Sequence, residues 1–414
     1  MTEFSTNRKT KIGQIERRGH RPDYWLPLLA VALLGIGLVV VYAISPGVSK
    51  ISGVSEAYYV SKQFLAIAMG IGAFIIMSKI PYKLWRNYTK FLIICSIVVA
   101  LAVQFLGSKV NGAYRWIQIG GISFQAAELM KFTVLVWAAD LMAKAKQSGK
   151  LDNWQTTLKP LAICLGLIAI VVGVFESDMG STAVMVGIIG AIVFVAGMPM
   201  KRLLSILAVI LIGVTLLVSA MPYRRQRLMT FLNPTANCQS TGYQSCQALI
   251  AVGSGGMFGL GLGHSVQAYG YLPEAANDSI FAILAEKFGF IGMTMILMIY
   301  ALFFSRIARI IERAPDDFSS FIVTGILAWF SVQATINIGA MIGLLPLKGI
   351  TLPFISYGGT SLLFVTGALG LVFNISRYSN FIVNKPGDTS NEDSTSGRGQ
   401  RRSYYTSTVR STRN

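Results

Sequence analysis

The sequence has few charged side chains and very few acidic ones. Only 13% of its residues are charged, about half the share of a typical soluble protein, and 18 acids stand against 36 bases. So little charge, combined with 53% hydrophobic residues and a mean hydropathy of +0.57, excludes an ordinary water-soluble domain. The apolar runs are continuous and do not alternate with polar residues, which argues against a transmembrane β-barrel.

Histidine and cysteine are also scarce, and no CxxC or HExxH pattern for a metal site occurs among the two histidines and four cysteines. Cys95 and Cys164 fall inside apolar runs and are expected to be core residues. Cys238 and Cys246 fall in a polar loop. They could form a disulfide that closes a short loop, or remain two free thiols in a reducing setting.

Hydrophobic segments long enough to cross a bilayer recur from Trp25 to Ile375. A helical crossing needs about 20 apolar residues, because backbone groups in lipid must be hydrogen-bonded within the segment. The sequence therefore predicts an all-α polytopic membrane protein with about ten transmembrane helices. The predicted spans are 25–45, 58–78, 90–107, 125–145, 159–175, 181–199, 203–221, 277–304, 319–343 and 357–376.

The net charge of +18 comes mainly from the two ends of the chain and from alternate loops. Residues 1–24 form a basic tail, and residues 377–414 form a second basic tail with the composition of a disordered segment. Positive loops stay in the cytoplasm, so both termini are expected there, with the ten-helix domain over residues 25–376 between them. Charge placed in this way sets the orientation of the protein in the membrane, and no nucleic-acid partner is expected.

The large extracytoplasmic loop predicted at about 222–276 departs from this rule, because it places Arg224 and Arg225 outside the cell. One explanation is that the predicted topology is in error. Another is that the preference for positive loops in the cytoplasm applies less strictly to long loops. A third is that these arginines bind an anion at the outer face, where Arg115 and Lys348 are also expected. The outer connections are polar and glycine-rich, whereas the inner ones are short and basic. The chemistry is therefore expected outside.

The segment GSGGMFGLGLG, over residues 253–263, looks like a nucleotide-binding loop but lacks its GK[ST] ending and its strand-to-helix context. Tight turns or close packing of backbone at the membrane surface are one interpretation, and substrate contact is the other.

Asp278, in YLPEAANDSIFAILAEKFG, stands at the mouth of the predicted span 277–304. An acidic side chain at the end of an apolar span has an energetic cost and usually has a function. Asp278 could cap the helix, could act as a general base, or could do both. Asparagine caps a helix as well as aspartate does but cannot accept the proton, so Asp278→Asn separates the two roles.

Other charged residues lie in or beside the predicted spans. Glu286 and Lys287 are adjacent and point about 100° apart on a helix, so each is expected to pair with another helix. Glu128 and Lys131, one turn apart, are candidates for structural pairing first and substrate contact second. In the turn ESDMGS, Asp178 could cap the following helix or assist the outer site with Glu176.

Several outer motifs occur together and in order: NGAYRWI, SFQAAELMK, ESDMGS, GYQSCQALIAVGSGG, GLGHSVQ, YLPEAANDSIFAILAEKFG and LPLKGITLPFISYGGTS. In this order they resemble the SEDS family (shape, elongation, division and sporulation) from the first to the tenth span. The phrase KGITLPFISYGGTS is more similar to division members than to elongation members.

The resemblance implies a peptidoglycan glycosyltransferase that polymerises lipid II at the outer face of the bacterial cytoplasmic membrane, at the division septum, and releases undecaprenyl pyrophosphate. It implies a class B penicillin-binding protein transpeptidase and other divisome proteins as partners. A divalent cation, Mg or Mn, is expected to help the leaving group, and its ligands are unknown. Asp278 matches the family's catalytic acid, and the implied substrate-binding residues are Glu274, Arg115, Lys131, Glu128, Arg224, Arg225, Lys348 and Ser356.

This sequence departs from the family pattern at several positions. The family's QPDxGT turn is ESDMGS here, its QPSE is QAAE, and its paired glutamates are Glu286 and Lys287. A lipid II flippase and a non-catalytic scaffold for the transpeptidase are the alternative functions. A flippase needs polar groups along a path to the inner face, whereas the motifs here gather outside.

Overall fold

The computed structural model describes the chain from residue 21 to residue 378, with short gaps. The two tails, Arg224 and Arg225, and most of the predicted span 203–221 lie outside the described residues. The gaps are 111–112, 120–121, 203, 207, 210–211, 214–225, 227–228, 234–237 and 241.

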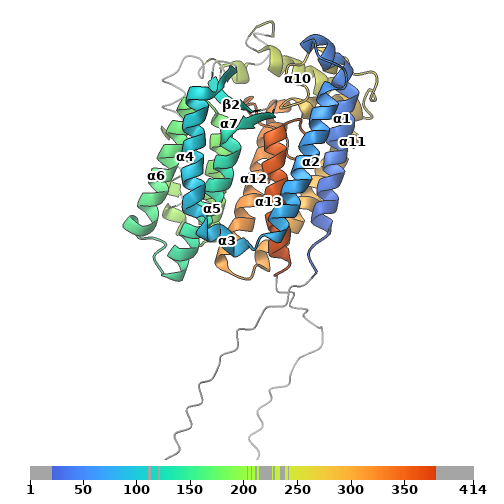
Figure 1. Cartoon of the computed structure of the whole chain (residues 1–414). Helices are drawn as coiled ribbons and strands as arrows, with labels where there is room; N and C mark the ends of the chain where they lie inside the picture. Colours follow the sequence, from blue (N-terminus) through green and yellow to red (C-terminus); the bar gives the residue numbers. More distant parts are fainter. Residues whose placement is uncertain are drawn as a thin grey trace, which may run out of the picture. The chain divides into compact units, whose positions relative to one another are not determined.

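The chain is a multi-pass membrane protein built almost entirely of helices (Figure 1). Within the described ranges, seven helical segments are long and apolar enough to cross a membrane. They are α1 (Trp25–Ser52), α2 (Tyr58–Lys79), α4 (Thr89–Leu106), Trp154–Phe175, α11 (Ile280–Glu312), α12 (Asp317–Met341) and α13 (Gly359–Ser376). The segment Trp154–Phe175 comprises α6 (Lys159–Ile168) between two π-helical turns, η1 (Trp154–Leu158) and η2 (Ala169–Phe175).

Two further helices, α5 (Ala126–Gln147) and α7 (Met179–Val195), also belong to the bundle. Nine of the ten predicted spans thus coincide with helices, and the all-α class is confirmed. Three shorter helices were not predicted. They are α3 (Tyr82–Asn87), α10 (Tyr243–Ser254) and the 3₁₀ turn η3 (Gln267–Tyr269).

Helix α12 lies at the centre of the bundle, packed against α5, α7 and α11. It is among the most buried of the helices, and the side chain of Trp329 is fully inaccessible. Phe330 stacks with Phe303 of α11, and the ring of Phe354 packs edge-on against both. This aromatic cluster joins α11 and α12 to the segment that precedes α13.

Helices α2 and α13 approach so closely that small residues are required between them. A Cβ added at Gly370 would lie 2.6 Å from the carbonyl oxygen of Phe74, and one at Gly70 would lie 2.8 Å from Thr366 Oγ1. Small residues at such contacts allow van der Waals packing along a whole membrane helix.

A small antiparallel sheet at one end of the bundle was not predicted. It consists of β1 (Ser108–Val110), β2 (Ala113–Ile119) and β3 (Ile122–Gln125), in the order β1-β2-β3. The segment YRWIQI in β2 is rich in β-branched and aromatic residues, which suit a pleated strand. Thr360 at the start of α13 donates a hydrogen bond to the Ser123 carbonyl and ties the sheet to the bundle.

Helix α11 is broken within the membrane-spanning segment, whereas the sequence predicted a continuous span. Gly289 has φ 63° and ψ −168°, a conformation open almost only to glycine. The glycine-rich segment 253–263 runs alongside the break, where the Phe290 amide donates to the Gly256 carbonyl at 2.9 Å and the Leu260 amide donates to the Glu286 carbonyl at 2.9 Å. Added Cβ atoms at Gly255 and Gly259 would lie 2.0 and 2.2 Å from carbonyl oxygens of α11. The segment 253–263 therefore packs its backbone closely against α11, which agrees with the close-packing interpretation of its sequence.

Candidate functional site

The turn over residues 271–279 leads into α11 and carries Asp278. Ser279, not Asp278, occupies the N-cap position of α11, and its side chain makes no capping hydrogen bond. Of the alternatives for Asp278, the N-cap position is thus taken by Ser279, and the general-base role stays a prediction. The amides of Asn277 and Ser279 both donate to the Glu274 carbonyl, at 3.0 and 3.2 Å, which closes the turn. Glu274 itself is exposed and accepts a hydrogen bond from the Asn277 side chain.

A second segment, 342–358, lies against this turn. The Tyr357 amide donates to the Ala276 carbonyl at 2.9 Å. Asn337 of α12 donates through Nδ2 to the carbonyls of both Asp278, at 2.7 Å, and Ile350, at 2.6 Å. Asp278 Oδ2 lies only 3.6 Å from the position of a Cβ at Gly349. The half-buried Asp278 carboxyl is thus held beside the segment that contains Lys348, also half-buried.

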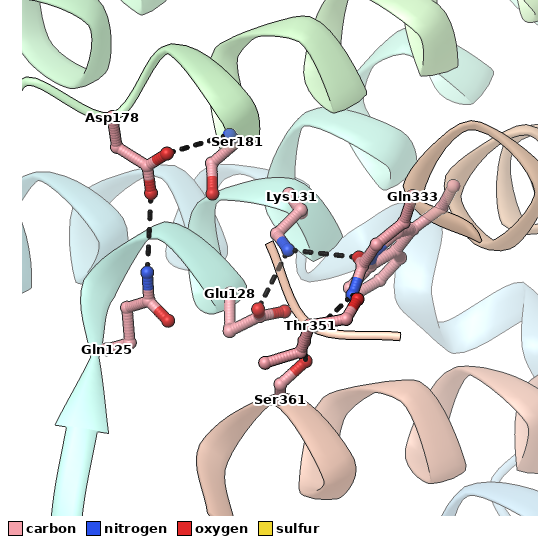
Figure 2. Close-up of polar contacts among 9 residues, drawn as sticks. Gln125, Glu128, Lys131, Asp178, Ser181, Gln333, Thr351 and Ser361 are labelled. Atoms are coloured by element: carbon pink, nitrogen blue, oxygen red, sulfur yellow. Dashed lines mark hydrogen bonds and ion pairs between the residues drawn. The ribbon is translucent and has the colours of Figure 1, made fainter. Parts of the chain in front are cut away.

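A buried polar network contacts this segment (Figure 2). Lys131 Nζ donates to Glu128 Oε1 at 2.8 Å and to Gln333 Oε1 at 3.3 Å. Gln333 Nε2 donates to the carbonyl and hydroxyl oxygens of Thr351, at 2.9 and 3.1 Å. The Thr351 hydroxyl contacts that of Ser361 at 3.0 Å. Lys131 and Glu128 are 1% and 3% exposed, so they position the loop from within the core.

Arg115 of β2 binds the turn between η2 and α7. Its Nε donates to the Glu176 carbonyl and its Nη2 donates to the Ser177 carbonyl, both at 2.7 Å. Asp178 accepts from the Ser181 amide at 2.9 Å, so it caps α7, and it also accepts from Gln125 Nε2 at 3.3 Å (Figure 2). An added Cβ at Gly180 would lie 3.2 Å from the Lys348 carbonyl oxygen. The turn therefore packs directly on the segment next to Asp278.

The predicted site residues thus fall into groups with different surroundings. Asp278 and Lys348 lie in adjoining segments. Arg115 holds the turn that packs on the second segment, and Lys131, paired with Glu128, reaches Thr351 of that segment through Gln333. Ser356 is 4% exposed and accepts from the Leu352 amide at 2.7 Å, so it shapes a turn within the core.

Gln333 and Asn337 are the residues that sequence reasoning missed. They are both buried on α12, at positions i and i+4 of one helix face. Two amides one turn apart in an apolar span were the available signal, since polar groups in such spans are costly and need partners.

Glu286 and Lys287 contact a loop, so the prediction that they pair with other helices is wrong. The Glu286 carboxylate accepts hydrogen bonds from the Ser265 hydroxyl and from the amides of Val266 and Gln267, at 2.8 and 3.1 Å for the amides. Lys287 Nζ donates to the Leu262 carbonyl at 2.7 Å. Both residues anchor the loop that follows α10.

Cys238 and Cys246 are joined by a disulfide, with 5.6 Å between their Cα atoms, which ties the start of α10 to the preceding chain. Among the residues that the structure describes, no group of three or more His, Cys, Asp or Glu side chains could hold a metal ion. The divalent cation expected from the sequence stays a prediction.

Glu176 lies in the turn that packs on the segment next to Asp278, and the pKa of its carboxyl is shifted. Burial raises the pKa of its carboxyl to about 8. The nearby Asp178 carboxylate also raises the pKa, and Arg115 lowers it. Glu176 is therefore mostly protonated at neutral pH.

The chain is similar to curated and solved proteins over most of its length. It is 37% identical over 360 residues to a probable peptidoglycan glycosyltransferase FtsW of Saccharophagus degradans, covering 86% of this chain and 92% of the relative. It is 36% identical over 364 residues to the stage V sporulation protein E of Bacillus subtilis, covering 87% and 98%.

Two solved structures share the fold. A chain of a peptidoglycan synthase complex, studied for its coordination of polymerization and crosslinking, superposes with a TM-score of 0.72 at 23% identity, over 86% of this chain and 98% of that one. The rod shape determining protein RodA of Thermus thermophilus superposes with a TM-score of 0.63 at 22% identity, over 87% and 98%. The family model of the FtsW, RodA and SpoVE cell cycle proteins matches residues 24–381, and this chain belongs to that family.

Proposed function

We propose that this chain is a peptidoglycan glycosyltransferase that polymerises lipid II, with Asp278 as its general base. The observation that carries the proposal is the placement of Asp278. Its carboxyl is half-buried beside Gly349, in a turn that Asn337 fastens to the segment containing Lys348. A base held by its own backbone contacts can meet an incoming hydroxyl without rearrangement. Relatives named as peptidoglycan glycosyltransferases support the activity.

In the proposed reaction, Asp278 takes the proton from the 4-hydroxyl of the acceptor's terminal N-acetylglucosamine. That oxygen attacks the anomeric carbon of the donor with inversion, and undecaprenyl pyrophosphate leaves with the electron pair of the broken bond. The leaving group gains negative charge near a low-dielectric membrane, so it needs cations. Lys348, in the segment that lies beside Asp278, is one candidate among the described residues. Arg224, Arg225 and a Mg or Mn ion are further candidates.

The description of the matching family, cell cycle protein, also supports a place in division. Under this proposal the end of the bundle with the sheet and α10 faces outward, and both tails are cytoplasmic. The protein acts at the septum with a class B penicillin-binding protein transpeptidase. The solved complex that couples polymerization to crosslinking supports a partnership of this kind.

Polymerisation of labelled lipid II by purified protein in detergent micelles tests the activity, with and without the transpeptidase. Asp278→Asn should lower the rate by about 10²–10⁴-fold, the usual contribution of a general base. Asp317→Asn, the same change at the opposite end of the bundle, is the control and should keep the wild-type rate.

A folded Asp278→Asn protein that polymerises at the wild-type rate contradicts the base assignment. Micelles have no sidedness, so polymer formed in them cannot arise from transport across a bilayer. Absence of product from the wild-type protein, even with the transpeptidase present, favours a flippase or a scaffold.

A further inference from the structure

An apolar cavity of about 640 Å³ lies between α4, α5, the α6–η2 segment and α7. Its walls include Leu101, Phe105, Leu167 and Val171. Phe105 is 82% exposed and Leu167 is 56% exposed on membrane-spanning helices, so the cavity adjoins the lipid-facing surface. An apolar cavity at that surface suits a hydrocarbon chain that enters from the bilayer.

Glu176 lines this cavity although most of the other lining residues are apolar. Its side chain is only 3% exposed, and neither carboxyl oxygen has a hydrogen-bond partner within the described residues. Leaving a buried polar group unsatisfied costs about 1–3 kcal/mol. Arg115 does not relieve this, because the hydrogen bonds it makes to this turn are to the backbone carbonyls of Glu176 and Ser177. The carboxyl is therefore available to a ligand in the cavity.

The turn that carries Glu176 connects the cavity to the candidate active site. Four residues after Glu176, a Cβ added at Gly180 would lie 2.5 Å from the Ile350 side chain and 3.2 Å from the Lys348 carbonyl oxygen, so the two segments are in close contact. Between those two residues lies Gly349, against which the Asp278 carboxyl rests. A ligand whose chain fills the cavity would thus present its polar end near Asp278.

We propose that this cavity holds the isoprenoid chain of a polyprenyl phosphate carrier, and that the Glu176 carboxyl donates a hydrogen bond to a phosphate oxygen of the same molecule. The inference rests on the proposed function, since it identifies where the lipid-linked substrate or product of that reaction is held. The sequence motif of the family has glutamine at this position, and glutamine can donate the same hydrogen bond. Glutamate can do so only while it is protonated, which makes carrier binding by this chain sensitive to pH.

The charges around Glu176 are consistent with this role. Burial and the Asp178 carboxylate raise its pKa to about 8, whereas Arg115 lowers it. The other polar side chains that line the cavity are uncharged at neutral pH: Ser96, Gln104, Thr133, Trp137 and Cys164. Ser96 and Thr133 are hydrogen-bonded to each other at 2.6 Å. A neutral Glu176 can therefore accept an anionic neighbour, and an ionised Glu176 repels it.

Photocrosslinking with a diazirine-bearing polyprenyl phosphate tests the proposal, with the labelled peptides identified by mass spectrometry. The wild-type protein should be labelled on α4, α5 or α6 at pH 6. At pH 9 about a tenth of Glu176 remains protonated, so labelling should fall about tenfold. Glu176→Gln should be labelled equally at both pH values.

Ala100→Trp fills the cavity and should abolish labelling there, whereas Ala301→Trp on the exposed face of α11 should not. A diazirine-bearing phosphatidylglycerol serves as the second probe. Equal labelling of the cavity by both probes, labelling elsewhere only, or labelling that Ala100→Trp leaves intact each overturns the proposal. A wild-type pH dependence that persists in Glu176→Gln overturns the role of Glu176.

Crosslinking requires no turnover, so this test fails or succeeds separately from the polymerase assay. If the cavity is labelled but Asp278→Asn still polymerises lipid II, the carrier site is supported and the assignment of Asp278 as the base is contradicted. Loss of polymerisation in Asp278→Asn without labelling of the cavity would do the reverse.

Discussion

The two ends of the helical bundle are held together by different kinds of contact. At the end that carries α3, which we call the charged end, the charged side chains pair with one another, as in Arg86 with Asp140 at 2.7 Å and Lys146 with Asp317 at 2.8 Å. At the end that carries the sheet and α10, the loop end, polar side chains bind backbone groups of loops. Arg115, Asn337 and Glu286 each hold two backbone groups.

This difference follows from what each end has to maintain. Ion pairs at exposed helix ends add about 0–1 kcal/mol each and do not determine the path of the backbone. A buried side chain that satisfies two backbone groups determines where a loop runs, and its loss leaves those groups unsatisfied. Asp278, Lys348 and Glu176 all lie on loops of the second kind, so their geometry depends on side chains that belong to other elements of the fold.

The largest effect on stability is expected at the break in α11. Gly289→Ala places a Cβ 2.3 Å from the Gly259 amide nitrogen, in a backbone region that alanine does not adopt. We expect destabilisation of about 3 kcal/mol or more, from strain and overpacking together. Thermal unfolding in detergent measures this. Gly166→Ala on α6, where an added Cβ meets nothing within 4 Å, should be neutral or slightly stabilising. Equal melting temperatures for the two variants would contradict the tight contact.

Two buried asparagines offer a matched test of the two ends. Asn337 at the loop end and Asn374 at the charged end are both 2% exposed. Asn374 donates to the Ser78 carbonyl at 2.7 Å and accepts from the Tyr82 amide at 3.3 Å. Replacement of either by leucine should cost about 2 kcal/mol in unfolding free energy, because backbone groups lose their partners.

Only Asn337→Leu should also slow polymerisation, by about 10–100-fold. A displacement of the reactive group by only about 1 Å is enough for a loss of this size. Asn374→Leu should melt at a lower temperature yet polymerise at the wild-type rate when assayed below that temperature. If both variants lose activity in proportion to stability, Asn337 has no positioning role.

The pH dependence of stability should report on Glu176, at the loop end. The pKa of Glu176 is about 8 in the folded protein, against 4.5 for the free side chain, so the folded state binds more protons between these values. Stability should therefore fall as pH rises from 5 to 8, by up to about 1.4 kcal/mol per pH unit, and then level off. Glu176→Gln should remove most of this slope in unfolding measurements. A slope that is the same in both proteins would assign it to other groups.

The sequence allowed the helices to be predicted better than the site. Long apolar runs identify membrane helices without knowledge of their neighbours, and the Asp178 cap was predictable because its partner, the Ser181 amide, is three residues away. Glu286 was misjudged because its partners lie about 20 residues earlier, in a loop whose path depends on the break at Gly289. Local patterns carry no information about such partners.

The site shows the same limit. The family resemblance singled out Asp278 and Lys348, but the sequence could not show that Gln333 and Asn337 of α12 hold their segments. The tie between Asn337 and Asp278 spans 59 residues and that between Gln333 and Thr351 spans 18. The small sheet was missed because its short strands, β1–β3, lie between two long apolar runs that dominate the pattern.

The smallest effect is expected at an exposed pair of the charged end, Lys146 with Asp317. Their side chains are 43% and 34% exposed, so water screens the attraction. Lys146 also lies 5.6 Å from the centre of the Phe321 ring, a contact that Asp317→Asn leaves in place. Asp317→Asn should therefore cost less than about 0.5 kcal/mol, and Lys146→Ala about 1 kcal/mol or less. Both should polymerise at the wild-type rate. A double-mutant cycle measured by unfolding should give a coupling energy below about 1 kcal/mol that shrinks in high salt. A larger, salt-insensitive coupling would mean that ion pairs at this end determine structure as the loop contacts do, and the contrast between the ends would not hold.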